Sequence, residues 1–324
     1  MSAALLAQIY ASPEDDALRQ VYGDWLIERD DPRGEFIALQ FKQARGVATA
    51  EDDRRVAALL REHWWPWAGN LAGAIHRPES RFEKGFLSTV KLGKASTPKK
   101  VLRQIVGDET WATVRHLEPA HIMGSYAKTV IHPVMKALRS VFLDHDHLPT
   151  ICAGPVPWSI QALQLRAWIL KDQHLTAIAE CPGFASLEHL ALSTGGESDE
   201  VMRRVLPAKI CERLQRLTLS LRGHSAAMES VVAALSCDSA IETLAVELNY
   251  FGCAATRHAT GVRSIAVVLR DSNEHAIALV TSFLAAARSA FSSCSLAHGS
   301  GVIPTRASEA FVRGLESAVV QPRA

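Results

Sequence analysis

Leu187-Glu-His-Leu190-Ala-Leu192 opens the part of the chain that determines the fold, because its pattern of apolar residues returns twice at a constant interval. Leu214-Gln-Arg-Leu217-Thr-Leu219 is the second line and Ile241-Glu-Thr-Leu244-Ala-Val246 the third, so the starting positions 187, 214 and 241 are equally spaced. An apolar template that recurs at a fixed step is the sequence signature of a solenoid. In a solenoid each repeat packs on its neighbours, so the 324 residues need no single central core.

The template can be aligned over residues 83–300, where it predicts about nine strands. The lines outside the central three start at Leu87, Val114, Leu138, Ile160, Val262 and Phe291. Helical periodicity fills several intervals, at 200–210, 226–235 and 274–287. The order strand, loop, helix, strand predicts an α/β chain whose parallel strands are joined by right-handed helical crossovers.

Such an array is expected to curve. Neighbouring strands lie about 4.8 Å apart, whereas packed helices need about 8–10 Å, so strands form the concave face and helices the convex face. An array of this kind, with L-x-x-L-x-L lines, resembles the ribonuclease-inhibitor type of leucine-rich repeat. The chain departs from that family at the ninth template position, where the usual Asn occurs only at Asn249. The arc is therefore expected to be irregular around the short steps that start at Leu138 and Ile241.

The N-terminal region carries helix signals of its own. Ser12-Pro13-Glu14-Asp15 predicts a helix start with the serine at the N-cap, and Asp31-Pro32 predicts a second start of the same kind. A third helix is predicted over 51–63 and is expected to stop at Pro66. The cluster Trp64-Trp65-Pro66-Trp67 has two interpretations. Packing against the first repeat is favoured, because Trp burial stabilises junctions between elements, and an aromatic binding platform is the alternative.

The stretch Val21-Tyr-Gly-Asp24-Trp25-Leu26-Ile-Glu28-Arg29-Asp-Asp31-Pro32-Arg33-Gly34-Glu35-Phe36, with Leu5-Leu6 and Pro13-Glu14-Asp15 before it, resembles the bacterial repeat-companion domain. The similarity runs from Leu5 to Gln40, with Gly23 standing where many members have Ala. The resemblance implies a small helical module N-terminal to leucine-rich repeats, without catalytic activity. Its charged residues have two readings. Helix caps and local ion pairs are favoured, and a binding patch at Asp24, Trp25, Glu28, Arg33 and Glu35 is the alternative.

Three segments follow from these patterns. Residues 1–82 are predicted to be an all-helical module and N-terminal cap, 83–300 the solenoid, and 301–324 a C-terminal cap with a helix over 306–319. Caps are expected because the ends of a solenoid otherwise expose an unpaired edge.

Composition favours a cytoplasmic protein. The net charge is +1, no run approaches the roughly 18 apolar residues of a membrane span, and the N-terminus lacks the basic start of a signal peptide. The six cysteines are scattered, which favours reduced thiols in small apolar sites. The basic stretch Lys84, Lys91, Lys94, Lys99, Lys100 and Arg103 is interpreted as a solvated face, with nucleic-acid binding as the less favoured reading.

Catalysis has little support in the sequence. Asp144-His145-Asp146-His147 has metal-ligand side chains, but consecutive residues of an extended chain point to opposite sides, so we expect a solvated loop. His116 and Glu118 share a strand face without a nucleophile nearby. The chain also lacks the P-loop, zinc-protease and nucleophile-elbow motifs. We therefore predict no catalytic residue, no cofactor and no metal.

The concave face is the predicted functional surface. It is expected to present Lys91, His116, Glu118, Phe142, Asp144, Gln164, Arg166, His189, Ser193, Arg216, Thr218, Ser220, Thr243 and Glu247. This mixed polar set with one aromatic suits a protein or peptide partner and predicts a non-catalytic scaffold or adaptor. Two alternatives stay open: a regulator of an NTPase that inserts Arg166 or Arg216 in trans, and a nucleic-acid-binding protein.

Overall fold

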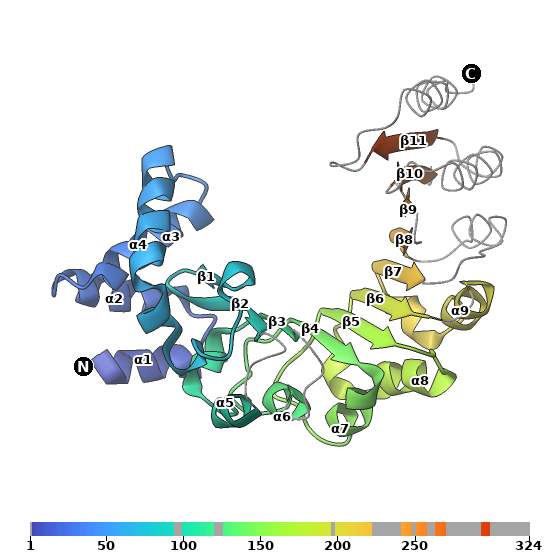
Figure 1. Ribbon diagram of the computed structural model, residues 1–324, viewed down its shortest axis with the longest axis horizontal. Helices are drawn as coiled ribbons and strands as arrows, with labels where there is room; N and C mark the ends of the chain where they lie inside the picture. The colour runs from blue at the N-terminus through green and yellow to red at the C-terminus, as the bar shows by residue number, and fades with distance from the viewer. Residues whose placement is uncertain are drawn as a thin grey trace. The chain divides into compact units, whose positions relative to one another are not determined.

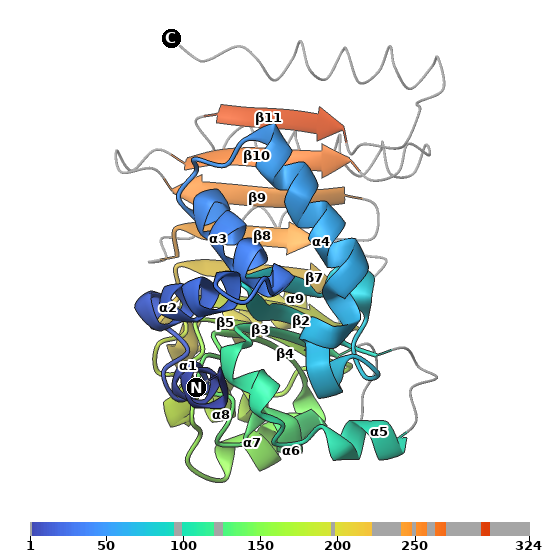
Figure 2. The same ribbon diagram turned by 90° about the vertical axis from the view of Figure 1, so that its left-hand side faces the viewer.

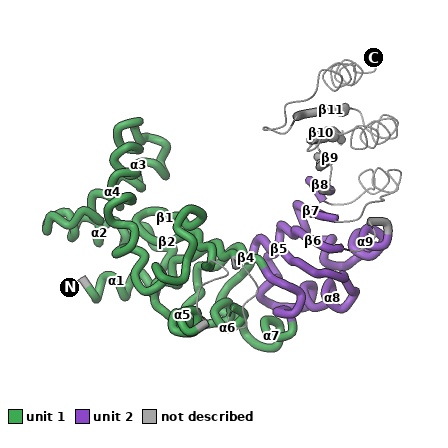
Figure 3. Tube along the Cα trace, in the orientation of Figure 1, with its two compact units in different colours: residues 1–142, 149–160 green, residues 143–148, 161–324 purple. Residues whose placement is uncertain are grey.

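The computed structural model describes residues 2–93, 99–119, 126–195, 198–221, 241–247, 251–257, 263–269 and 293–298 (Figure 1). The chain is α/β, with helices and an open, mostly parallel sheet whose strands follow one another in chain order. It divides into two compact units. Unit 1 comprises residues 1–142 and 149–160, and unit 2 comprises 143–148 and 161–324 (Figure 3).

Unit 1 begins with four helices: α1 (Ser2–Ala11), α2 (Asp16–Ile27), α3 (Pro32–Ala44) and α4 (Ala50–Ala68). Asp31 caps α3 with Pro32 in its first turn, as predicted. The predicted N-cap at Ser12 is wrong: the Ser12 N–H still bonds to Gln8 in the last turn of α1, and the Asp15 carboxylate caps α2. The prediction that Pro66 stops α4 is wrong, since the helix continues for two more residues and ends before Gly69. A proline this close to the end of a helix removes only one backbone hydrogen bond, which the helix tolerates.

The first three helices form one apolar core. Ile9 of α1, Tyr22 of α2 and Ile37 of α3 are buried in it, together with Phe86. Helices α2 and α3 lie against each other (Figure 2). They cross closely at Gly34, where an added Cβ would lie 2.6 Å from the backbone nitrogen of Ile27. Only glycine fits this crossing without a shift of the backbone.

Polar side chains of α2 and α3 hold the first hairpin, formed by β1 (Arg81–Glu83) and the antiparallel β2 (Phe86–Leu92). Gln40 donates to the Phe82 carbonyl at 2.9 Å and accepts from the Gly85 N–H at 2.8 Å. Arg33 donates to the Gly85 carbonyl and Arg19 to the Glu83 carbonyl. The segment 1–82 thus contains the start of a strand, and its predicted end lies inside a tightly bonded turn.

The tryptophan cluster divides between packing and surface. Trp64 and Trp67 are buried and contact the rings of Phe82 and Phe36. Trp65 is 52% exposed, with its ring 4.9 Å from that of Trp64. Two of the three rings therefore pack, but their ring contacts are with Phe36 and Phe82 inside residues 1–82, not with the first repeat.

The rest of unit 1 continues the sheet. Strand β3 (His116–Pro119) pairs in parallel with β2, and β4 (Ser140–Asp144) in parallel with β3. The connections contain α5 (Lys99–Gln104), η3 (Glu109–Thr113) and α6 (Tyr126–Val130), and η1 (Gly69–Leu71) and η2 (Arg77–Glu79) precede β1. After β4 come η4 (His145–His147) and α7 (Leu148–Cys152).

Unit 2 contains the most regular strands: β5 (Ala162–Ala167), β6 (His189–Thr194), β7 (Arg216–Leu221) and β8 (Thr243–Glu247). They pair in parallel, and their first residues, at positions 162, 189, 216 and 243, are equally spaced along the chain. Each strand also starts two residues after the first aliphatic residue of its template line. The second and third aliphatics, such as Leu190 and Leu192 of β6, are buried.

Helices cover one face of these strands. Helix α8 (Asp172–Glu180) and η5 (Pro182–Phe184) join β5 to β6, and α9 (Ser198–Val205) and η6 (Lys209–Arg213) join β6 to β7 (Figure 1). Leu175 of α8 and Val205 of α9 are buried under the sheet aliphatics. On the other face of these strands, Gln164 and Arg216 are exposed, and Ser193 and Thr218 are half-buried. The predicted helices over 226–235, 274–287 and 306–319 lie outside the described residues.

The prediction that all strands run parallel is wrong at two places. Besides β1, an unpredicted strand β9 (Phe251–Arg257) runs antiparallel to both β8 and β10 (Arg263–Leu269). Strand β11 (Ser293–His298) is parallel to β10. The link between β8 and β9 covers only positions 248–250, far too short for a parallel crossover, so the chain reverses instead. The short step between Ile241 and Val262 therefore holds a strand rather than a helix.

Candidate functional site

The open face of β5–β8 brings predicted site residues from distant parts of the chain into rows. One row across the strands is Ala162, His189, Arg216 and Thr243, the next is Gln164, Ala191, Thr218 and Ala245, and the third is Arg166, Ser193, Ser220 and Glu247. Neighbours in a row stand about 4.8 Å apart. We call this surface the open face.

The middle of the open face has small side chains. Ala191, Thr218 and Ala245 alternate with buried leucines and valines, which point to the helix side. Gln164 at the edge of this row is exposed. Because small side chains leave the pleat shallow, an extended chain that crosses this row can approach the sheet closely.

Arg216 and His189 lie side by side at one end of the open face. They are direct neighbours on β7 and β6, and Arg216 is exposed. Within the described ranges neither side chain forms an ion pair. An unpaired guanidinium offers a planar pair of donors to a carboxylate.

Arg166 and Asp144, both predicted on the concave face, pair with each other. The Asp144 side chain is 4% exposed and accepts from Arg166 Nε at 2.6 Å and from a terminal nitrogen at 3.1 Å. Asp144 was expected to face a partner but is buried, because the chain turns into η4 directly after it. Arg166 is held by this bidentate pair, which raises its pKa.

The ligand-type residues that follow β4 have structural contacts. The Asp144 N–H donates to His147 Nδ1 at 3.2 Å, and Asp146 pairs with His145. The same device recurs after β5, where the Lys171 N–H donates to His174 Nδ1 at 3.2 Å. Among the described residues no group of three or more potential ligands could hold a metal ion.

Trp168 is the main residue of the open face that the sequence analysis missed. It is 73% exposed and stands two residues beyond Arg166, at the next outward position after β5. Its ring carbons lie 3.8–3.9 Å from the point where a Cβ on Gly195 would stand, so the indole lies over Gly195. The Trp168 carbonyl accepts from the Gly195 N–H at 3.2 Å, which fixes the backbone. The sequence did contain a signal for this position: outward-facing residues alternate along β5 at 162, 164 and 166, and the same alternation continues to Trp168.

The predicted residues of unit 1 form a separate set. Lys91 of β2 lies beside Glu118 of β3 but bonds to Glu79 at 2.9 Å. His116 lies between Thr89 and Ser140 on the neighbouring strands. The Phe142 carbonyl accepts from the Tyr126 hydroxyl at 2.7 Å, and the Phe142 side chain is half-buried.

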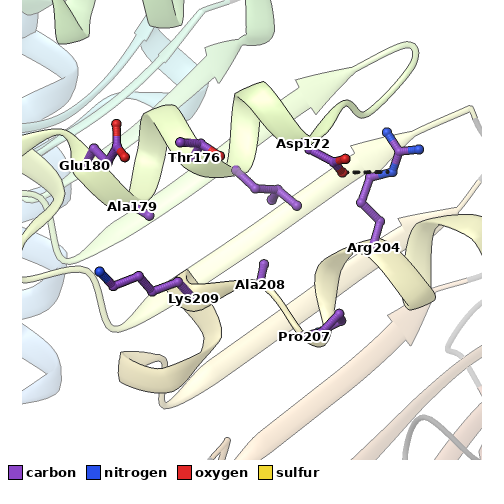
Figure 4. Close-up of a pocket in the computed structure, with 9 residues that line it drawn as sticks. Asp172, Thr176, Ala179, Glu180, Arg204, Pro207, Ala208 and Lys209 are labelled. Carbon is purple, nitrogen blue, oxygen red and sulfur yellow. Dashed lines mark ion pairs between the residues drawn. The ribbon is translucent and has the colours of Figure 1, made fainter.

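The helix side of unit 2 has a pocket of about 290 Å³ between α8 and the start of η6 (Figure 4). Asp172 and Arg204 pair across one end at 3.3 Å, and Glu180 and Lys209 stand at the other. Its wall between these ends is apolar, with Leu175 and Pro207. The polar groups are ordinary charges of both signs, without a nucleophile and base in contact.

Comparison of the chain with family models, curated proteins and solved structures found no match. In the described part of the chain, no helix is both long and apolar enough to cross a membrane.

Proposed function

We propose that this chain is a cytoplasmic leucine-rich-repeat solenoid preceded by a repeat-companion module, and that it works as a non-catalytic adaptor or scaffold. Its open face would be the concave face of the array and would bind an extended segment of a partner protein. The observation that carries this proposal is that one face presents an exposed Trp168 at one end and, towards the other, an exposed Arg216 that forms no ion pair with any described residue.

The dimensions of the face support a peptide ligand. Six residues separate the row of Ala162 from Trp168 along the strand, which is roughly 20 Å. That length matches about six residues of extended peptide. Trp and Arg are also the residues most often found at the energetic centres of protein interfaces, where they give large contact area and bidentate hydrogen bonds.

The alternative, a regulator of an NTPase with an arginine inserted in trans, now depends on Arg216. Arg166 would have to leave a buried carboxylate before it could reach another protein, and breaking such a pair typically costs about 3–5 kcal/mol. Nucleic-acid binding stays a third possibility, for which salt-dependent binding would be the sign.

Affinity capture with the full chain tests the proposal. Trp168→Ala and Arg216→Glu should each abolish recovery of a partner, whereas the control Arg103→Glu, an exposed charge reversal on α5 in unit 1, should not. Equal recovery by all variants would refute the open face as the binding surface. If the partner hydrolyses a nucleotide, unchanged turnover on addition of the protein would remove the regulator alternative.

A further inference from the structure

A second concave surface lies in unit 1, between α4 on one side and η2 with β1 on the other. It is an open groove with a volume of about 560 Å³, and its lining includes Leu60, Arg61, Trp64, Arg77, Arg81 and Phe82. We call it the arginine groove. Its lining has three arginines and no acidic residue, although the whole chain has a net charge of only +1.

Two arginines of the groove differ from several other arginines of unit 1, which are paired with carboxylates. Arg55 pairs with Glu35 at 2.6 Å, and both Arg115 and Arg139 pair with Glu14. By contrast, Arg61 and Arg81 are exposed and, within the described ranges, neither forms an ion pair. Three like charges in one groove repel one another, and this repulsion is relieved when an anion binds between them.

Arg77 is held in place on the groove wall. It donates to the Leu60 carbonyl of α4 at 3.2 Å, and its guanidinium carbon lies 5.6 Å from the centre of the Trp64 ring. This contact links η2 to α4 and orders one cation before any ligand arrives. Pre-ordering of this kind lowers the entropy that binding must overcome.

The floor of the groove is apolar. Trp64 and Phe82 are buried beneath it with their ring centres 6.2 Å apart, and Leu60 and Pro78 complete the wall. Ala57, one helical turn before Arg61, has too short a side chain to fill the space. A ligand that fits both the floor and the rim needs an apolar group beside its negative charge.

We propose that the arginine groove binds an acidic peptide segment of a partner protein, with carboxylates on Arg61 and Arg81 and one apolar side chain over Trp64 and Phe82. Arginine suits this task because its planar donors match a carboxylate bidentately. The groove would give the N-terminal module a recognition role of its own, independent of the open face in unit 2.

The surroundings of the groove favour a short acidic peptide over nucleic acid. Glu62, next to Arg61, has a side chain that is 73% exposed, and Glu79 and Glu83 flank the arginines of η2 and β1. These carboxylates would repel a polyphosphate backbone that ran past the groove. A peptide with one or two acids can place its charge between the arginines and avoid the glutamates.

Fluorescence anisotropy with the full chain tests this proposal. The probe is a short labelled peptide of glutamates around one central phenylalanine. Two matched peptides replace the glutamates by lysines or the phenylalanine by serine, and an oligothymidylate serves as the nucleic-acid probe. Binding should need both the acids and the phenylalanine, and should weaken as salt is raised.

Three variants locate the site. Arg61→Glu and Ala57→Phe should each weaken binding by about tenfold or more, the first through charge and the second by filling the groove. Arg103→Glu should leave the affinity within about twofold, and circular dichroism confirms that each variant is folded. Failure of the glutamate–phenylalanine peptide to bind at low salt, equal losses in Arg61→Glu and Arg103→Glu, or tighter binding of the oligothymidylate would overturn the proposal.

Discussion

Replacing Arg166 by alanine tests whether the Asp144–Arg166 pair belongs to the fold or to a recognition surface. The Asp144 carboxylate is buried and accepts two charge-assisted hydrogen bonds from Arg166. Truncation leaves this carboxylate without a counter-charge, a change that typically costs about 3–5 kcal/mol. Because the Arg166 side chain is 41% exposed, water screens the pair, and we expect a loss at the low end, about 3 kcal/mol.

Replacing Asp144 instead of Arg166 should reduce the free energy of unfolding by a smaller amount. Asp144→Asn removes the buried charge and leaves the half-exposed Arg166 guanidinium in contact with water, so the expected loss of unfolding free energy is about 1–2 kcal/mol. Arg216 is exposed on β7 and forms no ion pair among the described residues. Arg216→Ala should therefore change the free energy of unfolding by less than about 0.5 kcal/mol.

Urea unfolding of the full chain at neutral pH measures the three losses, with the midpoint and slope followed by circular dichroism. The order Arg166→Ala, then Asp144→Asn, then Arg216→Ala is the expected result. Equal effects of the first two variants, or losses below about 0.5 kcal/mol for both, would refute the assignment of Asp144 to the buried part of unit 2.

Two further predictions concern stability. Gly34→Ala should destabilise the chain by about 1–3 kcal/mol because its Cβ would lie 2.6 Å from the Ile27 backbone nitrogen. Gly23→Ala should change stability by less than about 1 kcal/mol, since its Cβ would stand no closer than 3.0 Å to any atom, the Cγ2 methyl of Ile37; equal losses in urea would contradict the steric argument. Burial lowers the pKa of His147 and of His174 in the folded chain, so the unfolded chain takes up protons first as the pH falls, and stability should decline below about pH 6.5. The double variant His147→Asn/His174→Asn should lose less stability than the wild type between about pH 7.5 and 5.5. An unchanged loss would exclude these histidines as the cause.

Periodicity along the chain was sufficient to locate most of the strands. The aliphatic residues at 190, 192, 217 and 219 are buried as the template predicts, and β5–β8 recur at the equal steps that the template lines set. Alternation along a strand depends only on neighbouring residues, so it can be read without knowing what the strand packs against. The Asp31-Pro32 helix start is local in the same sense, because a capping side chain bonds to backbone groups close to it in the sequence.

The features of the two binding surfaces that the sequence did not determine depend on contacts between distant segments. The burial of Asp144 requires Arg166 from the next strand, and the prominence of Trp168 depends on the absence of a side chain at Gly195. The arginine groove combines side chains from α4, η2 and β1, none of which carries the signal alone. Local spacing specifies which residues point away from the core. The side chains that they contact, and hence whether they are ion-paired or exposed, are set only when the chain has folded.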